Sequence, residues 1–241
     1  IGGLVPILYF SRPNTSRLKL VRTKLEWRPI WRSCSNGASE MMTNLSMSLV
    51  NTLYNLQLMR FTGEDGVAAY GVIMYVNFIF VAIYMGYSIG SAPIVGYHYG
   101  AKHQEELRGL LRRSLWILGI GAVLLTVAGE LLSSPLSKIF ASYDDALFAM
   151  TRHGFRLYSL SYLLCGFNIF GSAFFTALNN GMVSAVISFA RTLVFQIVCV
   201  LVLPIFLELN GIWISILVAE FLGILVTASL LIANRKKYSY F

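Results

Sequence analysis

Polar side chains recur on one face of a long apolar stretch near the beginning of the chain. Between Asn36 and Asn55, an acid, an alcohol and several amides follow one another at helical spacing: Glu40, Asn44, Ser48, Asn51 and Asn55. On a helix this spacing produces a single polar stripe. A carboxylate inside hydrocarbon costs about 3 kcal/mol on insertion scales. The pattern therefore predicts a helix that lines an ion or substrate pathway. The alternatives are hydrogen bonding between packed helices for the asparagines, and hydration near the cytoplasmic end of the helix for Glu40.

Further polar side chains share faces in two later apolar segments. Asn77 and Tyr84 lie on one face of the second segment, together with Tyr70 and Ser88. Aromatic rings with polar tips suit a cavity for organic cations, through cation–π contacts, and suit helix packing equally well. In the fourth segment, Asn168 shares a face with Tyr158, Tyr162 and Ser172.

Two charged residues lie deep inside apolar segments. Arg191 is surrounded by apolar residues, and Glu220 lies near the middle of the last segment. Charges at such depth need partners, so we expect Arg191 to pair with an acid or with carbonyl groups; extension of its side chain to the membrane interface is the alternative. Glu220 is expected to serve either a gating role or a structural pair with a neighbouring helix. Arg156 lies near the end of its segment, where its side chain can reach the membrane interface.

The composition is that of a membrane protein with several spans. Hydrophobic residues make up 56% of the 241 residues and charged residues 12%, and the mean hydropathy is +0.67. Soluble domains have about 25% charged residues. Backbone groups in lipid must be satisfied internally, and apolar runs of this length exclude barrel strands, so the predicted class is all-α. The expected spans are 33–59, 66–97, 110–132, 151–178, 183–206 and 211–233.

The segments outside these spans suggest four parts. Residues 1–10 are apolar but too short to cross a bilayer, so we interpret them as the end of a truncated transmembrane helix. Residues 11–32 form a basic linker, residues 33–234 the six-helix transmembrane lobe, and residues 235–241 a basic tail.

The basic residues predict the orientation of the lobe. They gather in alternate connections: Arg12 to Arg32, then Lys102 to Arg113, then Arg235 to Lys237. Positive charges favour the cytoplasmic side, so the linker, the 97–113 loop and the C-terminus are expected in the cytoplasm, with the lobe in the plasma (inner) membrane. The net charge of +8 is then a sign of topology rather than of nucleic-acid binding.

Four segments, in order and spacing, resemble the C-terminal half of the multidrug and toxic compound extrusion (MATE) family. They are NGASEMMTNLSMSLVNTLYN, GYSIGSAPIVGYHYGAKHQEEL, FNIFGSAFFTALNNGMVSAVISFART and ELNGIWISILVAEFLG. The resemblance implies a twelve-helix antiporter with two six-helix lobes around a cleft, the N-terminal lobe being absent here. It also implies export of amphipathic cations driven by inward Na⁺ or H⁺. In some branches a key acid stands where this chain has Met47, so the resemblance does not assign that role to Glu40.

The predicted function is therefore Na⁺- or H⁺-coupled efflux of organic cations by alternating access, in contact with membrane lipids and without a metal or organic cofactor. A lipid-linked oligosaccharide flippase of the same superfamily is the first alternative. It would need several cations in its cavity, where this half offers Arg156 and Arg191. An intramembrane enzyme would need clustered His, Asp or Ser side chains, and a channel would favour rings of identical groups from several subunits.

Overall fold

The computed structural model describes residues 4–11, 26–142, 144–238 and 240. The chain divides into two compact units, Ile1–Ser33 and Cys34–Phe241. The described parts of the first unit are helix α1 (Leu4–Ser11) and the first turns of helix α2 (Trp27–Thr62). Residues 12–25 of the expected linker lie outside the described residues, so the expected boundaries of these parts stay predictions.

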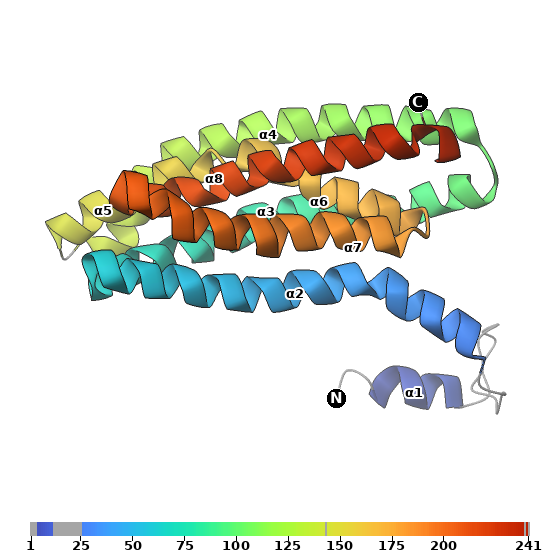
Figure 1. Ribbon diagram of the computed structural model, residues 1–241, viewed down its shortest axis with the longest axis horizontal. Coiled ribbons are helices and arrows are strands. Elements are labelled where there is room, and N and C mark those ends of the chain that lie inside the picture. The colour runs from blue at the N-terminus through green and yellow to red at the C-terminus, as the bar shows by residue number, and fades with distance from the viewer. Residues whose placement is uncertain (1–3, 12–25, 143, 239, 241) are drawn as a thin grey trace. The chain divides into compact units, whose positions relative to one another are not determined.

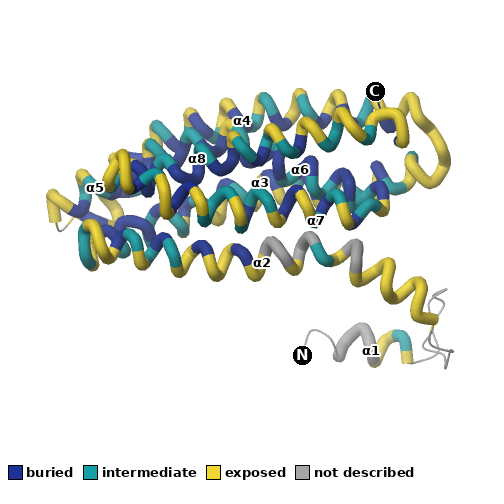
Figure 2. Tube along the Cα trace, viewed as in Figure 1, coloured by how far each residue is buried: buried dark blue, intermediate teal, exposed yellow. Residues whose placement is uncertain are grey.

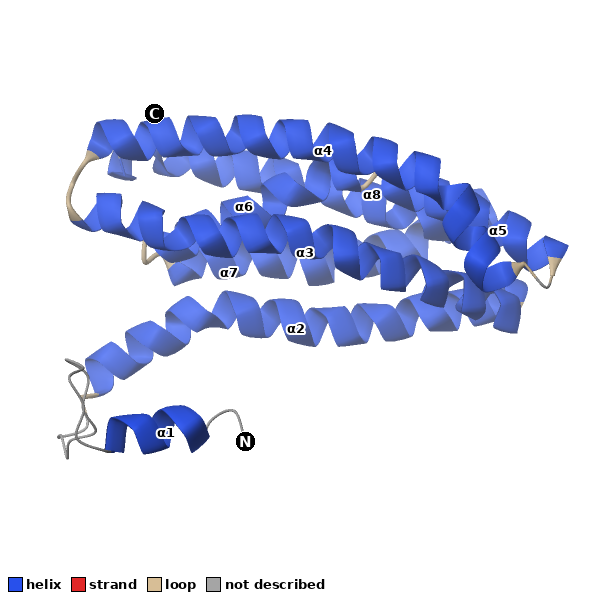
Figure 3. Ribbon diagram, turned by 180° about the vertical axis from the view of Figure 1, so that it is seen from behind, coloured by secondary structure: helices blue, strands red, loops and turns tan. Residues whose placement is uncertain are grey.

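The described part of the second unit consists of helices joined by short loops. After α2 come α3 (Glu64–Gly100), α4 (Gln104–Ala141), α5 (Asp145–Ser159), α6 (Tyr162–Ala177), α7 (Gly181–Phe189), the π-helical turn η1 (Ala190–Phe195) and α8 (Gln196–Tyr238). Figure 3 shows helices and connecting loops and no strand among the described residues. The all-α prediction is confirmed.

The run from α7 to the end of α8 contains two helical segments of opposite direction. Glu208 has non-helical backbone angles (φ 48°, ψ −131°) inside α8, and the ribbon reverses in this region (Figure 1). Gly211 permits the tight return, because a Cβ there would lie 2.5 Å from the carbonyl carbon of Leu203. The reversal falls between the two last predicted segments, 183–206 and 211–233.

The predicted order of six segments is recovered in α2, α3, α4, the pair α5–α6 and the two parts of the last run. The pair α5–α6 is bent by 49° at a short break. The segments are longer than predicted: α4 continues to Ala141 with Pro135 inside it, although the sequence suggested an end near Leu132. Proline removes one helical hydrogen bond but does not always end a helix in a membrane protein.

Length and hydropathy identify the membrane spans among the described residues. Helices α3 and α4 and the run 181–238 are long and apolar enough to cross a membrane, and the bent pair α5–α6 makes a fourth candidate. Helix α2 is equally long but is interrupted by polar residues. Several helices of this length and hydropathy are typical of a multi-pass membrane protein.

Small residues let the helices approach closely around an aromatic core. Trp213 and Tyr162 are buried in this core, and buried residues follow the facing sides of the helices (Figure 2). A Cβ at Gly154 would lie 2.8 Å from the Trp213 ring, and a Cβ at Gly166 would lie 2.5 Å from the Tyr84 ring. Glycine at these two positions therefore makes room for large rings, which is how membrane helices commonly pack.

Candidate substrate and ion pathway

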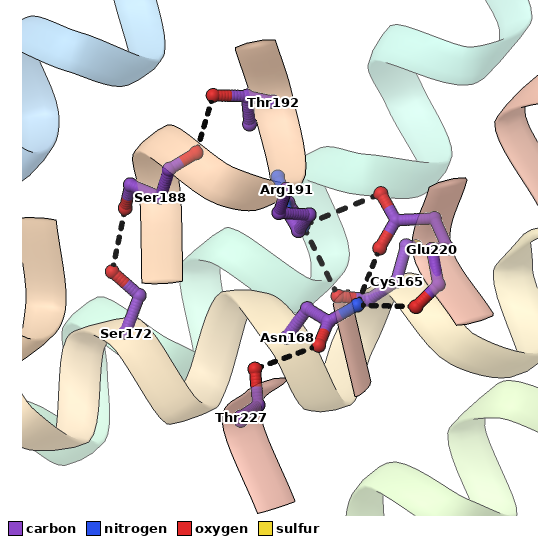
Figure 4. Close-up of polar contacts among 8 residues, drawn as sticks. All are labelled: Cys165, Asn168, Ser172, Ser188, Arg191, Thr192, Glu220 and Thr227. Carbon is purple, nitrogen blue, oxygen red and sulfur yellow. Dashed lines mark hydrogen bonds and ion pairs between the residues drawn. The ribbon is translucent and has the colours of Figure 1, made fainter. Parts of the chain in front are cut away.

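Asn168 is the centre of a buried polar network (Figure 4). Its side chain, on α6, is 0% exposed. The Nδ2 atom donates to Glu220 Oε2 at 2.7 Å and to the backbone carbonyl oxygen of Glu220 at 2.9 Å. Thr227 Oγ1 donates to Asn168 Oδ1 at 2.9 Å. One amide side chain therefore binds α8 at two places, which fixes the position of α6 against it.

Arg191 joins the same network from the π-helical turn η1. Its Nη1 atom lies 3.5 Å from Glu220 Oε1 and donates to the carbonyl oxygen of Cys165 at 3.5 Å. The two side chains are 13% and 4% exposed, respectively, so the pair is largely shielded. A π-turn inserts a residue into the helix, and such turns are frequent at functional sites. The structure thus pairs Arg191, on η1, with Glu220, on α8. The carbonyl group of Cys165, on α6, accepts a hydrogen bond from the same arginine.

A ladder of hydroxyl groups connects α6 with α7 beside this network. Ser172 Oγ lies 2.9 Å from Ser184 Oγ and 2.8 Å from Ser188 Oγ, and Thr176 Oγ1 lies 2.7 Å from Ser184 Oγ. Thr192 donates to the Ser188 carbonyl oxygen at 2.6 Å. Ser172 was among the residues predicted to share a polar face, but its partners on α7 were not. The signal was the spacing of Ser184, Ser188 and Thr192 by one helical turn.

The polar stripe of α2 lies away from the face by which α2 packs. Its side chains are exposed at Asn44, Ser48 and Asn51 and half-buried at Asn55, whereas the side chain of Glu40 lies outside the described residues. The packing face of α2 comprises Ser46, Val50, Tyr54 and Leu58. Tyr54 lies 2.6 Å from the Ser215 hydroxyl and stacks on Tyr70.

Helix α2 also has an exposed apolar face. Leu45, Leu49 and Leu56 lie one or two turns apart and are 61%, 49% and 62% exposed. Counted by 100° per residue, this apolar face, the polar stripe and the packing face point in three different directions. The stripe and the buried Asn168 network are therefore separate parts of the second unit, and the structure does not bring them together.

Tyr84 and Asn77 differ in their surroundings. Tyr84 is 2% exposed, and its hydroxyl donates to the carbonyl oxygen of Tyr162 at 2.8 Å. Asn77 is half-buried. Tyr70 and Ser88, which share their helical face, are buried as well. In this unit the face of Tyr84 serves helix packing, which was one of the two alternatives raised by the sequence.

A second ion pair was missed by the sequence analysis. Arg156 Nε lies 2.9 Å from Glu130 Oε2, and Ser159 Oγ donates to Glu130 Oε1 at 2.8 Å. The side chains of Arg156 and Glu130 are 57% and 30% exposed, so water reaches this pair. Glu130 follows an apolar run and gave no periodic signal. Among the described residues, no group of three His, Cys, Asp or Glu side chains could hold a metal ion.

Several known proteins are similar to this chain. The probable multidrug resistance protein YoeA of Bacillus subtilis (strain 168) is 24% identical over 135 residues, which cover 56% of this chain and 29% of that protein. A crystal structure of MATE in complex with MaL6 superposes with a TM-score of 0.83 at 18% identity, covering 97% of this chain and 54% of that chain. The outward-facing conformation of a multidrug resistance MATE family transporter gives a TM-score of 0.79 at 20% identity, covering 90% and 50%.

A transporter of the MOP superfamily from Pyrococcus furiosus, whose binding pocket is described as reversed in polarity, gives a TM-score of 0.78 at 21% identity over 89% of this chain and 50% of its own. The chain thus spans about half the length of these solved structures and less of the curated relative. The family model for MatE matches residues 41–202, which is more than half of the chain. This chain therefore belongs to the MatE family of membrane transporters.

Proposed function

We propose that this chain is the C-terminal lobe of an antiporter that exports amphipathic organic cations in exchange for Na⁺ or H⁺. Support comes from the family match over residues 41–202 and from a relative named as a multidrug resistance protein. The solved structures are about twice as long as this chain, which leaves room for a second lobe of similar size. On this proposal the protein is a transporter, not an enzyme.

The observation that carries the proposal is the polar stripe of α2. The second unit leaves Asn44, Ser48 and Asn51 exposed, although it has ample apolar surface for lipid. Polar groups on a membrane helix face a protein partner or a watery cavity rather than hydrocarbon. We infer that this stripe, with Glu40 and Asn55, forms one wall of the central cleft against the N-terminal lobe.

The buried network supplies a possible link between ion binding and helix position. A proton or Na⁺ that reaches Glu220 would compete with Arg191 for Oε1. Because Asn168 and Arg191 belong to α6 and η1, loosening this carboxylate would affect three elements at once. Differential binding of ion and drug to two states of the lobe is what couples their movements. Asn77 and Tyr84 contribute through the packing of α3.

The orientation follows from the charges at the two ends of the lobe. The start of α4 and the end of α8 lie at the same end of the second unit (Figure 1). That end holds the basic residues Lys102, Arg108, Arg112, Arg113, Arg235, Lys236 and Lys237. By the positive-inside rule this end faces the cytoplasm, and with it the C-terminus, in a plasma membrane.

The flippase alternative is weakened by the ion pairs. A pyrophosphate-linked substrate requires cations that are free to bind phosphate. The two arginines that the sequence offered for this role are already engaged, Arg156 with Glu130 and Arg191 with Glu220.

The test is efflux from vesicles that contain the full-length protein, with Na⁺ and H⁺ gradients imposed separately. We expect a fluorescent organic cation to move under one of the two gradients. If the cation moves under neither gradient, the antiporter proposal is wrong. Unchanged efflux by Glu40→Gln at every pH would remove Glu40 from the coupling mechanism and leave the rest of the stripe as the cleft wall.

A further inference from the structure

A groove between α4 and Tyr240, near the C-terminal end, is lined by two arginines, apolar side chains and that buried tyrosine. Its volume is about 460 Å³, and its lining residues are Arg108, Leu111, Arg112, Leu115, Trp116 and Tyr240. All but Tyr240 come from three turns of α4. This volume lies within the usual range for small-molecule sites, roughly 300–1,000 Å³. The groove lies at the basic end of the second unit, and none of its lining residues belongs to the stripe or to the Asn168 network.

The two arginines are placed as an anion site would require. Arg108 and Arg112 are one helical turn apart, so their charges repel each other along one face of α4. Both side chains are exposed, and among the described residues neither takes part in an ion pair. Repulsion between like charges is relieved by an anion bound between them, and planar guanidinium groups suit phosphate oxygens.

The remaining lining is apolar and continues away from the arginines. Leu111 is 2% exposed and Leu115 is half-buried, whereas Trp116 is 68% exposed. Tryptophan side chains are enriched at membrane–water interfaces, where the ring sits at the level of lipid headgroups. The groove therefore changes from cationic to apolar along α4, as a phospholipid changes from phosphate to acyl chain.

Tyr240 is the one lining residue that comes from outside α4. Tyr240 is 1% exposed, its hydroxyl donates to the Leu231 carbonyl oxygen at 2.9 Å, and its ring packs edge-on against Phe174. Burial raises the pKa of the Tyr240 phenol above its ordinary value, so this side chain remains uncharged and does not repel an anion. The described residues Glu105 and Glu106 precede Arg108 on α4, where they reduce but do not cancel the local positive charge.

We propose that this groove binds the headgroup of an anionic phospholipid, with the phosphate on Arg108 and Arg112 and the first acyl carbons along Leu115 and Trp116. Basic pockets on the cytoplasmic side of membrane helices are a recognised place for such headgroups. The proposal does not depend on which ion or drug is transported. It concerns a lipid that remains bound at the surface of the lobe.

The test is native mass spectrometry of the full-length protein, titrated with phosphatidylglycerol, phosphatidylcholine or inorganic phosphate. We expect phosphatidylglycerol to bind at lipid concentrations at which phosphatidylcholine does not. The variant Arg108→Gln/Arg112→Gln should weaken this binding about thirtyfold, since each of the two basic residues near the surface contributes about 1 kcal/mol. The control Arg235→Gln/Lys236→Gln removes the same charge at the same end of the unit but leaves the groove intact.

Three results would overturn the proposal. They are an equal loss of binding in the control variant, no preference for phosphatidylglycerol over phosphatidylcholine, and displacement of the lipid by inorganic phosphate at equal concentration. A second measurement needs no arginine variant. Brominated phosphatidylglycerol should quench the fluorescence of Trp116, taken as the difference between wild type and Trp116→Phe, more strongly than brominated phosphatidylcholine. Equal quenching by the two lipids would also contradict the proposal.

Discussion

Asn168 and Glu220 are joined twice by a single amide nitrogen. Nδ2 of Asn168 donates to the Glu220 carboxylate at 2.7 Å and to the Glu220 backbone carbonyl at 2.9 Å. Because both bonds end on one residue of α8, they fix the rotation of that helix as well as its distance from α6. The same amide accepts from Thr227 nearly two turns further along α8.

Replacing Asn168 should therefore loosen the lobe. Asn168→Ala removes the donor to a buried carboxylate, and hydrogen bonds to charged groups contribute about 1.5–3 kcal/mol. Asn168→Asp should be worse, because it places a second acid next to Glu220. The measurement is the thermal unfolding midpoint of the purified full-length protein. The control Asn234→Ala removes a bond within one helix, to the Leu230 carbonyl, and should change the midpoint little; equal effects of the two alanine variants would contradict the prediction.

The ion pair between Arg191 and Glu220 should show strong energetic coupling. Removing one partner leaves the other as a largely buried charge, which costs about 3–5 kcal/mol in soluble proteins. We expect Arg191→Gln and Glu220→Gln each to lower stability and the double variant to be less harmful than the sum of the two. A double-mutant cycle measured by unfolding should give a coupling energy of at least about 1 kcal/mol. Additive effects would show that Arg191 and Glu220, although 3.5 Å apart, are not energetically coupled.

Gly223 lies where the network would be disturbed by one methyl group. A Cβ at this position would come within 2.8 Å of Asn168 Nδ2 and 3.0 Å of Arg191 Cγ. Gly223→Ala should therefore displace the Asn168 amide from Glu220, at a cost of about 1–3 kcal/mol for overpacking. Gly86→Ala is the matched control, since a Cβ at Gly86 would have nothing within 4 Å. Unfolding midpoints of the two variants decide the matter, and a Gly223→Ala protein as stable as the control would refute the proposed crowding.

The sequence predicted the helices better than the partners of their polar side chains. The cost of charge in hydrocarbon indicated that Arg191 and Glu220 needed partners. It could not show that they pair with each other, because the pairing depends on a π-helical turn that no periodic pattern signals. Tyr84 illustrates the converse case. The spacing of Asn77 and Tyr84 places both on one helical face. Spacing alone does not tell whether that face meets a cavity or another helix. Likewise, the predicted segment 110–132 ends earlier than α4, which continues through Pro135 to Ala141.

The outer ion pair should behave differently from the buried one. Arg156 and Glu130 are partly exposed to solvent, so their attraction is screened by salt. Pairs of this kind contribute about 0–1 kcal/mol. We expect Arg156→Gln to lower stability much less than Arg191→Gln, and the difference between wild type and Arg156→Gln to shrink at high salt. A large, salt-independent effect of Arg156→Gln on the unfolding midpoint would point to a role beyond this surface pair.

The assignment of the three faces of α2 can be tested by cysteine labelling in intact membranes. Single cysteines at Ser48 and Asn51 probe the polar stripe, and single cysteines at Leu49 and Leu56 probe the exposed apolar face. The background lacks the exposed Cys34 and any cysteine outside this chain, whereas Cys165 and Cys199 are buried and can stay. If the stripe lines a water-filled cleft, a membrane-impermeant thiol reagent should modify Ser48→Cys and Asn51→Cys in at least one state of the transporter. The thiols on the apolar face should resist it, because a thiol must ionise to react and hydrocarbon opposes ionisation.

Protection of the stripe by a transported cation would place the substrate in the cleft. Equal labelling of the two faces would mean that α2 has no preferred aqueous side, and the cleft-wall proposal would be wrong.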